Sequence, residues 1–118
     1  MPLRRREGIE AMKLIKAVVR PEKANEVLSA LCDAGYVSAT RYSILGRGKQ
    51  RGLKVSNISY DELPKEMIMM VVPDEAEEEI KKIIIQTART SKNGMFGDGK
   101  IFVLPVQKSV TISSGLEE

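Results

Sequence analysis

Gly97-Asp98-Gly99-Lys100 is the stretch of this chain whose residue types best suit ligand binding, and an apolar run, Ile101–Val103, follows it directly. Glycine lets the backbone turn tightly and approach a ligand closely. Backbone amides beside a lysine are typical of sites that bind anions, most often phosphates. The stretch therefore predicts a phosphate-binding turn at the start of a buried strand.

A second segment rich in glycine and cations, Gly46-Arg47-Gly48-Lys49-Gln50-Arg51-Gly52, lies upstream. Two such segments in one small chain favour a nucleotide as the ligand. Other kinds of site are excluded by the residue types present. With no histidine and one cysteine, the chain cannot form a Ser-His or Cys-His catalytic pair, and the same shortage excludes a zinc site.

The composition is typical of a single globular domain. Of the 118 residues, 42% are apolar and 30% are charged, which disfavours disorder. A net charge of only +3 and a lack of tryptophan argue against a nucleic-acid surface. The single cysteine fits a reducing cytoplasm, and no apolar run approaches the roughly 20 residues that span a bilayer. Residues 1–11 are basic without a secretory pattern, so we expect a flexible extension there.

Hydrophobic periodicity predicts the elements that position the glycine segments. Helices are expected at 22–34 and 75–89, and strands at 12–20, 36–45, 63–72 and 100–106. A further edge strand is expected at 109–112. In the first helix, we expect Cys32 to be a small core residue.

This order, β-α-β, loop, β-α-β, is the ferredoxin-like arrangement. It is an α+β fold in which two helices cover one face of a four-stranded antiparallel sheet. The first strand alternates Leu14 and Val18 with Ile15 and Val19, so both of its faces carry apolar side chains. A sheet face that is apolar but not covered by helices predicts self-association.

Seven short segments, taken together and in this order, resemble the nitrogen regulatory PII signal-transduction family. They are Met12-Lys13-Leu14-Ile15, Arg20-Pro21-Glu22-Lys23, the segment 46–52, Leu63-Pro64-Lys65, Val71-Val72-Pro73-Asp74, Thr87-Ala88-Arg89-Thr90 and Gly97–Val103. The resemblance implies a PII-like domain over 12–112, with a target-docking loop, the T-loop, at 46–62 and a C-terminal tail at 113–118. It also implies a homotrimer that signals and is not an enzyme.

Within that family the chain looks most like the NifI-type subgroup, which regulates nitrogenase. The loop from 52 to 63 is short, and the segment 58–65 is similar to that subgroup. Tyr60 does not align with the tyrosine that is uridylylated in other branches. The resemblance implies a cytoplasmic protein that binds dinitrogenase reversibly, together with a second NifI paralogue, and whose inhibition is relieved by 2-oxoglutarate.

The resemblance further implies ATP or ADP, Mg²⁺ and 2-oxoglutarate as ligands, in a cleft between subunits. The implied nucleotide-binding residues are Val18, Thr40, Gly46, Lys49, Gln50, Val71, Gly97, Asp98, Gly99 and Lys100. Those implied for 2-oxoglutarate are Gln50, Gly52, Lys65 and Gly97. Gln50 would also be a ligand of Mg²⁺, and Lys65 would pair with the far carboxylate of 2-oxoglutarate.

The chain departs from the family pattern in three ways. The loop 91–96 is longer than the usual connection into Gly97, and Met69 stands where the family has a glutamate near the ribose. Thr111 and Ser113 stand where two arginines reach the phosphates across the subunit boundary. Because a charge-assisted hydrogen bond is worth roughly 1.5–3 kcal/mol, these two changes predict weaker ATP binding.

Three other functions remain open at the level of the sequence. A GlnK-like regulator of an ammonium transporter ranks second, because it needs an arginine at the tip of a longer loop, whereas Arg51 and Lys54 lie near the loop's base. A small ferredoxin-like enzyme is disfavoured, because Asp98 between two glycines is expected to shape the turn and not to act as a base. A nonspecific nucleic-acid binder ranks last.

Overall fold

The computed structural model describes residues 11–47 and 62–117. Its main elements are β1 (Met12–Val19), α1 (Pro21–Asp33), β2 (Thr40–Gly46), β3 (Leu63–Pro73), the short 3₁₀ helix η2 (Asp74–Ala76), α2 (Glu77–Ala88) and β4 (Gly99–Val106). Two short strands, β5 (Val110–Thr111) and β6 (Leu116–Glu117), follow. None of the helices in the described ranges is long and apolar enough to cross a membrane.

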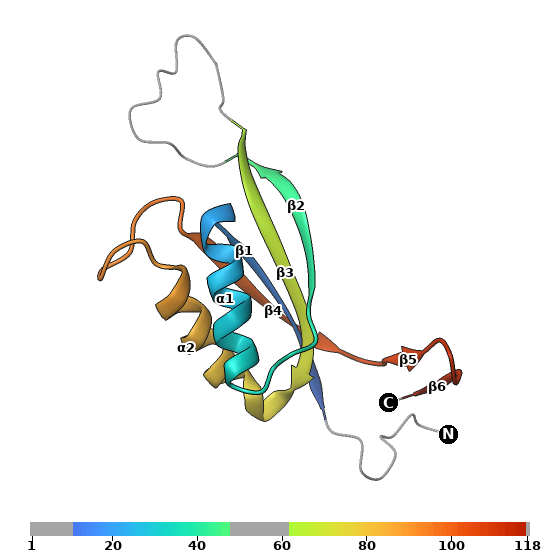
Figure 1. The fold of residues 1–118 in the computed structure, drawn as a ribbon. Coiled ribbons are helices and arrows are strands. Elements are labelled where there is room, and N and C mark those ends of the chain that lie inside the picture. The colour runs from blue at the N-terminus through green and yellow to red at the C-terminus, as the bar shows by residue number, and fades with distance from the viewer. Residues whose placement is uncertain (1–10, 48–61, 118) are drawn as a thin grey trace.

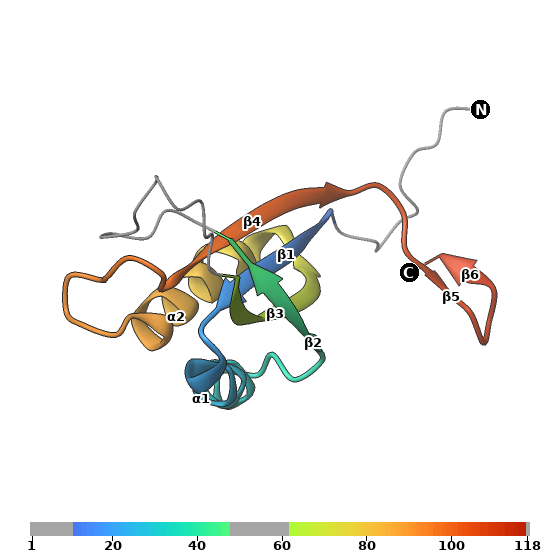
Figure 2. The same cartoon turned by 90° about the horizontal axis from the view of Figure 1, so that it is seen from above.

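The four long strands form one antiparallel sheet in the order β2-β3-β1-β4. Both helices pack on the same face of this sheet, and the other face carries no helix in the described part of the chain (Figures 1 and 2). This is the ferredoxin-like α+β fold that the order of elements predicts.

The hydrophobic core lies between the sheet and the two helices. β1 sends Ile15 and Val19 into it, and both are almost fully buried. The helices contribute a stripe at a spacing of three and four residues, as amphipathic helices do. Its buried members are Ala24, Val27 and Leu31 in α1, and Ile80, Ile84 and Ala88 in α2. The alternating apolar residues of the strands and the apolar stripes of the helices therefore form one core.

The face of the sheet without helices is apolar, as the sequence predicts. Val71, Phe102 and Leu104 are all exposed there, on β3 and β4, the two strands that flank β1. Leu14 lies between them, because the antiparallel register pairs it with both Val71 and Leu104. An exposed apolar face of this size is typical of a surface that another chain covers.

A buried carboxylate, Glu66, ties β2 to β3 beneath α1. It accepts hydrogen bonds from Arg41 Nε at 2.9 Å and from Ser43 Oγ at 2.6 Å, and Arg41 Nη1 donates to Asn25 Oδ1 at 2.6 Å. The bonds from Arg41 and Ser43 lower the pKa of Glu66 below its ordinary value. The cluster thus satisfies a charge on the helix-facing side of the sheet.

The second strand begins later than predicted, at Thr40 and not at residue 36. Gly35 ends α1 with a positive φ of 99°, and the Tyr36 N–H donates to the Leu31 carbonyl at 2.9 Å. This is a Schellman-type helix end, and it binds residue 36 to the helix. The Tyr36 hydroxyl also donates to Glu79 of α2, so this tyrosine joins the two helices.

The prediction that Cys32 belongs to the core is wrong, because Cys32 is exposed. The buried stripe of α1 runs through Ala24, Val27 and Leu31. Each residue advances about 100° around a helix, so the residue after Leu31 faces away from that stripe. Leu28, by contrast, is partly buried and packs against the core.

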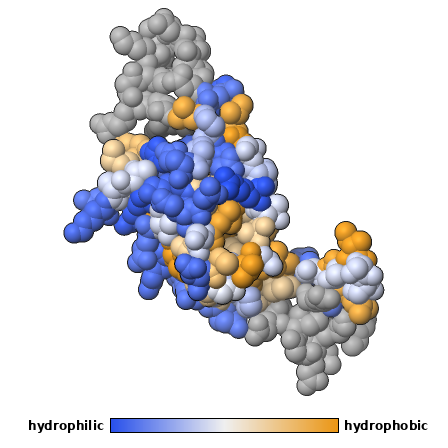
Figure 3. Space-filling view, viewed as in Figure 1, coloured by the Kyte–Doolittle hydropathy of each residue, from blue (hydrophilic) through white to orange (hydrophobic). Residues whose placement is uncertain are grey.

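The predicted edge strand at 109–112 is also wrong. Val110 and Thr111 pair with Leu116 and Glu117 in a separate hairpin of β5 and β6, and not with the main sheet. Val106, the last residue of β4, already pairs with Met12, the first residue of β1, so β1 has no further residue with which a longer β4 could pair. The hairpin projects from the body of the molecule (Figure 1), and apolar colour covers much of it (Figure 3).

Candidate functional site

The turn Gly97–Lys100 connects the loop after α2 to β4, and its glycines are required by the backbone. Gly97 and Gly99 have φ angles of 90° and 121°, which side chains rarely allow. A Cβ atom on Gly99 would lie 1.8 Å from the Val18 carbonyl oxygen. Gly99 is therefore needed for the close contact of β4 with β1, whatever ligand the turn holds.

Asp98 is the centre of a hydrogen-bond network that fixes the loop. Its carboxylate accepts bonds from Arg20 Nε at 3.0 Å, Thr90 Oγ1 at 2.9 Å and the Met95 N–H at 2.8 Å. A longer bond of 3.3 Å comes from the Thr90 N–H. The Asp98 N–H donates a hydrogen bond to the Met95 carbonyl at 3.2 Å. Asp98 thus shapes the turn, and its own amide is already engaged within the loop.

This network determines the charge state of Asp98. Partial burial by itself would raise the pKa of the carboxyl group, but the bonds from the Met95 N–H, Thr90 and Arg20 outweigh it and lower the pKa to about 2. The carboxylate is therefore ionised at neutral pH, and its charge faces the Arg20 guanidinium. An ionised acceptor of this kind makes stronger hydrogen bonds than a neutral one.

Arg20 is a residue of the site to which the sequence assigned no role there. Besides its bond to Asp98, its Nη2 atom donates to the Phe96 carbonyl at 2.7 Å. Its position follows from the pairing of β1 with β4, because Val19 lies opposite Gly99. Arg20, the residue directly after β1, then lies beside Asp98, the residue that precedes Gly99. Recognising this contact from the sequence would have required the strand register.

Lys65 also contacts the turn, from the start of β3. Its Nζ atom donates to the Gly97 carbonyl. Partial burial and the nearby charge of Arg20 lower the pKa of Lys65. The nearby carboxylates of Glu22 and Asp98 act against this shift in pKa. Lys65 and Arg20 nevertheless place two cationic side chains against the turn, and cationic side chains attract anions.

The remaining described residues of the predicted site lie on the open face of the sheet or at its end. Val18 pairs with Lys100 across β1 and β4, Val71 pairs with Leu14, and Thr40 pairs with Met69. The structure thus brings Val18, Lys65 and the turn 97–100 together, while Thr40 and Val71 lie further along the sheet. Gly46 pairs with Leu63 where β2 ends and β3 begins.

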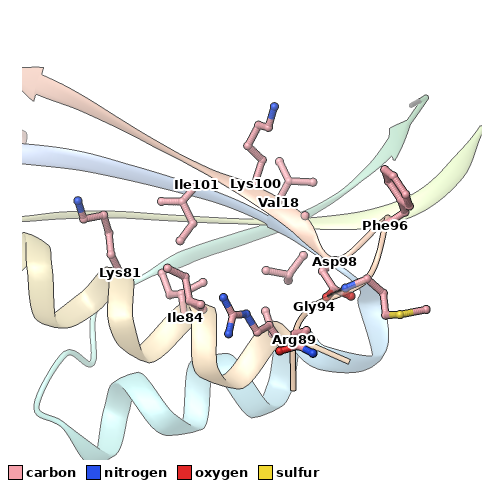
Figure 4. A pocket seen from close by; sticks show the side chains of 15 residues that line it. Val18, Lys81, Ile84, Arg89, Gly94, Phe96, Asp98, Lys100 and Ile101 are labelled. Carbon is pink, nitrogen blue, oxygen red and sulfur yellow. Dashed lines mark hydrogen bonds between the residues drawn. The ribbon is translucent and has the colours of Figure 1, made fainter. Parts of the chain in front are cut away.

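A groove of about 1000 Å³ opens between α2 and β4, beside this turn. Ile84 and Ile101 face each other across it, and Arg89 and Asp98 lie at the end near Gly94 (Figure 4). Lys100 points away from α2, toward the open side of the sheet (Figure 4). The turn therefore separates two surfaces, the open sheet face and the groove.

Comparisons with known proteins agree with this geometry. The model of the family described as nitrogen regulatory protein P-II matches residues 12–115. The chain belongs to the P-II family. It is 54% identical over 101 residues to the "Nitrogen fixation nifHD region glnB-like protein 1" from Methanococcus maripaludis. The match covers 86% of this chain and 93% of the relative.

Other relatives carry similar names. The "Nitrogen fixation nifHD2 region GlnB-like protein 1" from Methanosarcina barkeri is 50% identical over 104 residues. These residues cover 88% of this chain and 96% of that protein. Among solved structures, the PII protein of Arabidopsis thaliana bound to citrate superposes with a TM-score of 0.72 at 28% identity. That match covers 95% of this chain and 90% of the plant chain. The resemblance to NifI-type P-II proteins is thus confirmed.

Part of the P-II ligand set lies outside the described residues. This applies to Lys49, Gln50 and Gly52, and hence to the predicted magnesium ligand, as well as to Tyr60. Within residues 11–47 and 62–117, no group of three or more acidic, histidine or cysteine side chains could hold a metal ion. The described residues therefore offer cations and backbone groups suited to an anion, and no metal cage.

The departures from the P-II pattern have clear positions. Met69 lies on the open face, where the Tyr42 hydroxyl donates a hydrogen bond to its sulfur at 3.7 Å, so an uncharged acceptor stands where the family has an acid. Thr111 pairs with Leu116 in the β5–β6 hairpin. In Figure 1 this hairpin lies at the far end of the molecule from the loop that precedes β4. Thr111 is therefore remote from the turn of its own chain.

Proposed function

We propose that this P-II protein is a regulator of nitrogen metabolism that binds ATP or ADP together with 2-oxoglutarate and Mg²⁺, and that it controls nitrogenase. The observation that carries the proposal is the braced turn 97–100 with Lys65 and Lys100 beside it. The names of the relatives, which place them in nitrogen-fixation gene regions, support nitrogenase as the target.

Each described residue has a distinct task in this proposal. Lys100 pairs with the nucleotide phosphates, and Val18 offers an apolar surface to the base from the adjacent position on β1. Lys65 pairs with a carboxylate of 2-oxoglutarate through the two N–H donors that its bond to the Gly97 carbonyl leaves available. Gln50 would be a ligand of Mg²⁺, and the metal, when bound, would neutralise charge on the phosphates and the 2-oxoacid.

Regulation then follows from differential affinity. Without 2-oxoglutarate, the protein binds dinitrogenase and inhibits it. With MgATP and 2-oxoglutarate bound, the segment between β2 and β3 no longer fits the target. The ligands shift this equilibrium only as far as their affinities for the two states differ. A second NifI paralogue is expected to share the assembly, and the cytoplasm is the expected compartment.

A homotrimer is part of the same proposal. The apolar face that carries Val71, Phe102 and Leu104 is the surface available to other copies, and a shared interface would place ligands between subunits. Native mass spectrometry of the purified chain should give three copies. A monomer both with and without the paralogue would refute this part.

Isothermal titration calorimetry tests the ligands. MgATP should bind, and 2-oxoglutarate should bind only when MgATP is present. Lys100→Ala should weaken MgATP binding by at least about tenfold, as expected when a charged hydrogen bond is lost. Lys82→Ala removes the same charge from the exposed side of α2 and should change nothing. If neither ligand binds, with or without the paralogue, the sensor function is refuted.

The target is tested separately. The protein should reduce dinitrogenase activity when added in stoichiometric amounts, and 2-oxoglutarate with MgATP should restore that activity. Binding to an ammonium-transport channel in place of dinitrogenase would instead support the GlnK-like function.

A further inference from the structure

Three exposed apolar side chains form a patch where the loop after α2 meets that helix. Met95 and Phe96 are 61% and 66% exposed, and Ile85 of α2 is 41% exposed. All three line the groove between α2 and β4, and Figure 4 shows Phe96 at the end of that groove, next to Asp98 and Gly94. Neighbouring apolar side chains left in solvent often mark an interaction site.

The backbone that carries the patch is fixed. The Met95 N–H donates to the Asp98 carboxylate, the Met95 carbonyl accepts from the Asp98 N–H, and the Phe96 carbonyl accepts from Arg20. These bonds hold the backbone of both residues in place, and both side chains are largely exposed. A partner therefore meets a loop that is already ordered, which lowers the entropic cost of binding.

The charges around the patch favour an acidic partner. Arg89 lines the same groove, and Arg20 and Lys65 contact the turn at its end. Asp98 also lines it, but its carboxylate is engaged by Arg20, Thr90 and the Met95 N–H. Positive charge therefore remains around an apolar centre. The complementary surface has apolar side chains at its centre and carboxylates around them.

The position of the patch connects it to the regulated target. Lys65, near the start of β3, contacts the carbonyl of Gly97, the residue directly after Phe96. The patch thus lies at the end of the sheet where β2 ends and β3 begins (Figure 1). A protein that binds at this end would meet the patch beside the end of β2 and the start of β3.

We propose that Ile85, Met95 and Phe96 form a docking surface for an acidic, apolar segment of the protein that this chain regulates. This rests on the proposed function, in which the target is dinitrogenase. The surface provides affinity that does not depend on the nucleotide contacts, because none of its three side chains belongs to the predicted ligand set.

Surface plasmon resonance with immobilised dinitrogenase tests the surface, using the full chain with its paralogue and no 2-oxoglutarate. Met95→Ser/Phe96→Ser should bind at least about tenfold more weakly, as is typical of central apolar contacts. Ile85→Ser, on a different element, should also weaken binding. Val37→Ser, which replaces a similarly exposed residue outside the groove, should bind like the unchanged protein. Added salt should weaken the binding of the unchanged protein, because it screens the charges around the patch.

Each other outcome is decisive. If the unchanged protein binds dinitrogenase and all the variants bind equally well, the docking surface is refuted and the proposed function stands. If the unchanged protein does not bind, both fall. If the double variant loses MgATP affinity in calorimetry, the patch belongs to the ligand site. If native mass spectrometry shows a changed number of copies, the patch is a contact between copies. Either result overturns the docking surface.

Discussion

Replacing Asp98 by asparagine should destabilise the protein, and the size of the effect should depend on pH. The folded-state pKa of Asp98 is about 2, against an ordinary value of 3.8. At about 1.4 kcal/mol for each pH unit, this difference corresponds to about 2 kcal/mol of stability. The pKa of Asp98 is lower in the folded state than in the unfolded state. This stability is therefore fully present above the unfolded-state pKa, and it is lost as the pH falls through the folded-state pKa.

Urea denaturation followed by circular dichroism measures this, with both proteins at one fixed concentration because assembly affects apparent stability. At pH 7, Asp98→Asn should lower the free energy of unfolding by about 2 kcal/mol. The difference in stability between the two proteins should shrink between about pH 4 and pH 2. Below that range it should nearly vanish, because Asp98 of the unchanged protein is then protonated and, like asparagine, carries no charge. Asp33→Asn, the same chemical change at an exposed position of α1, is the control and should have little effect.

The result that would refute the reasoning is a difference that stays constant from pH 7 to pH 2. In that case, the carboxylate's charge would contribute nothing, and the loop would be held by hydrogen bonds that an amide makes equally well. An effect as small as that of Asp33→Asn at pH 7 would refute the clamp itself.

Five further substitutions, in three comparisons, test the fold by urea denaturation. Gly99→Ala should cost about 3 kcal/mol or more, because its Cβ would meet the Val18 carbonyl oxygen at 1.8 Å in an already strained conformation. Gly35→Ala has a similar φ but nothing within 4 Å of its Cβ, so it should cost only about 1–2 kcal/mol; equal costs would contradict the steric argument. Ile80→Ala in the fully buried part of α2 should cost about 2–5 kcal/mol and Ile80→Val about 0.5–1.5 kcal/mol, and a reversed order would place Ile80 outside the core. Glu66→Gln should lower the urea midpoint at pH 7, because Arg41 then loses its charged partner, and an unchanged midpoint would mean that the ion pair adds no stability.

The sequence predicts the order of elements well, because each element has a local signal. The alternation around Ile15 and Val19 and the three- and four-residue spacing through Ile80 and Ile84 are set by neighbours in the chain. The failures are at positions where distant contacts decide. Tyr36 stays at the end of α1 because of a hydrogen bond to Leu31, and the segment around Val110 pairs with itself because β1 has already ended.

The candidate site shows the same limit. The glycines and lysine at 97–100 stand out by type, and they predict a turn that favours an anion. Arg20 does not stand out, because an arginine at the end of a strand is usually exposed to solvent. Its role depends on the register of β1 against β4, which residue types alone do not specify. For the same reason the sequence assigns Lys65 a ligand but does not reveal its contact with the Gly97 carbonyl.

That contact between Lys65 and the Gly97 carbonyl uses one of the three N–H donors of the ammonium and leaves two for an anion. The long side chain is therefore held in one direction before any ligand arrives. Binding then costs less side-chain entropy than it would at a lysine that moves freely in solvent. Because the carbonyl belongs to the backbone, this support does not depend on the side chain of another residue. Its consequence is a lower concentration at which the anion half-fills the site.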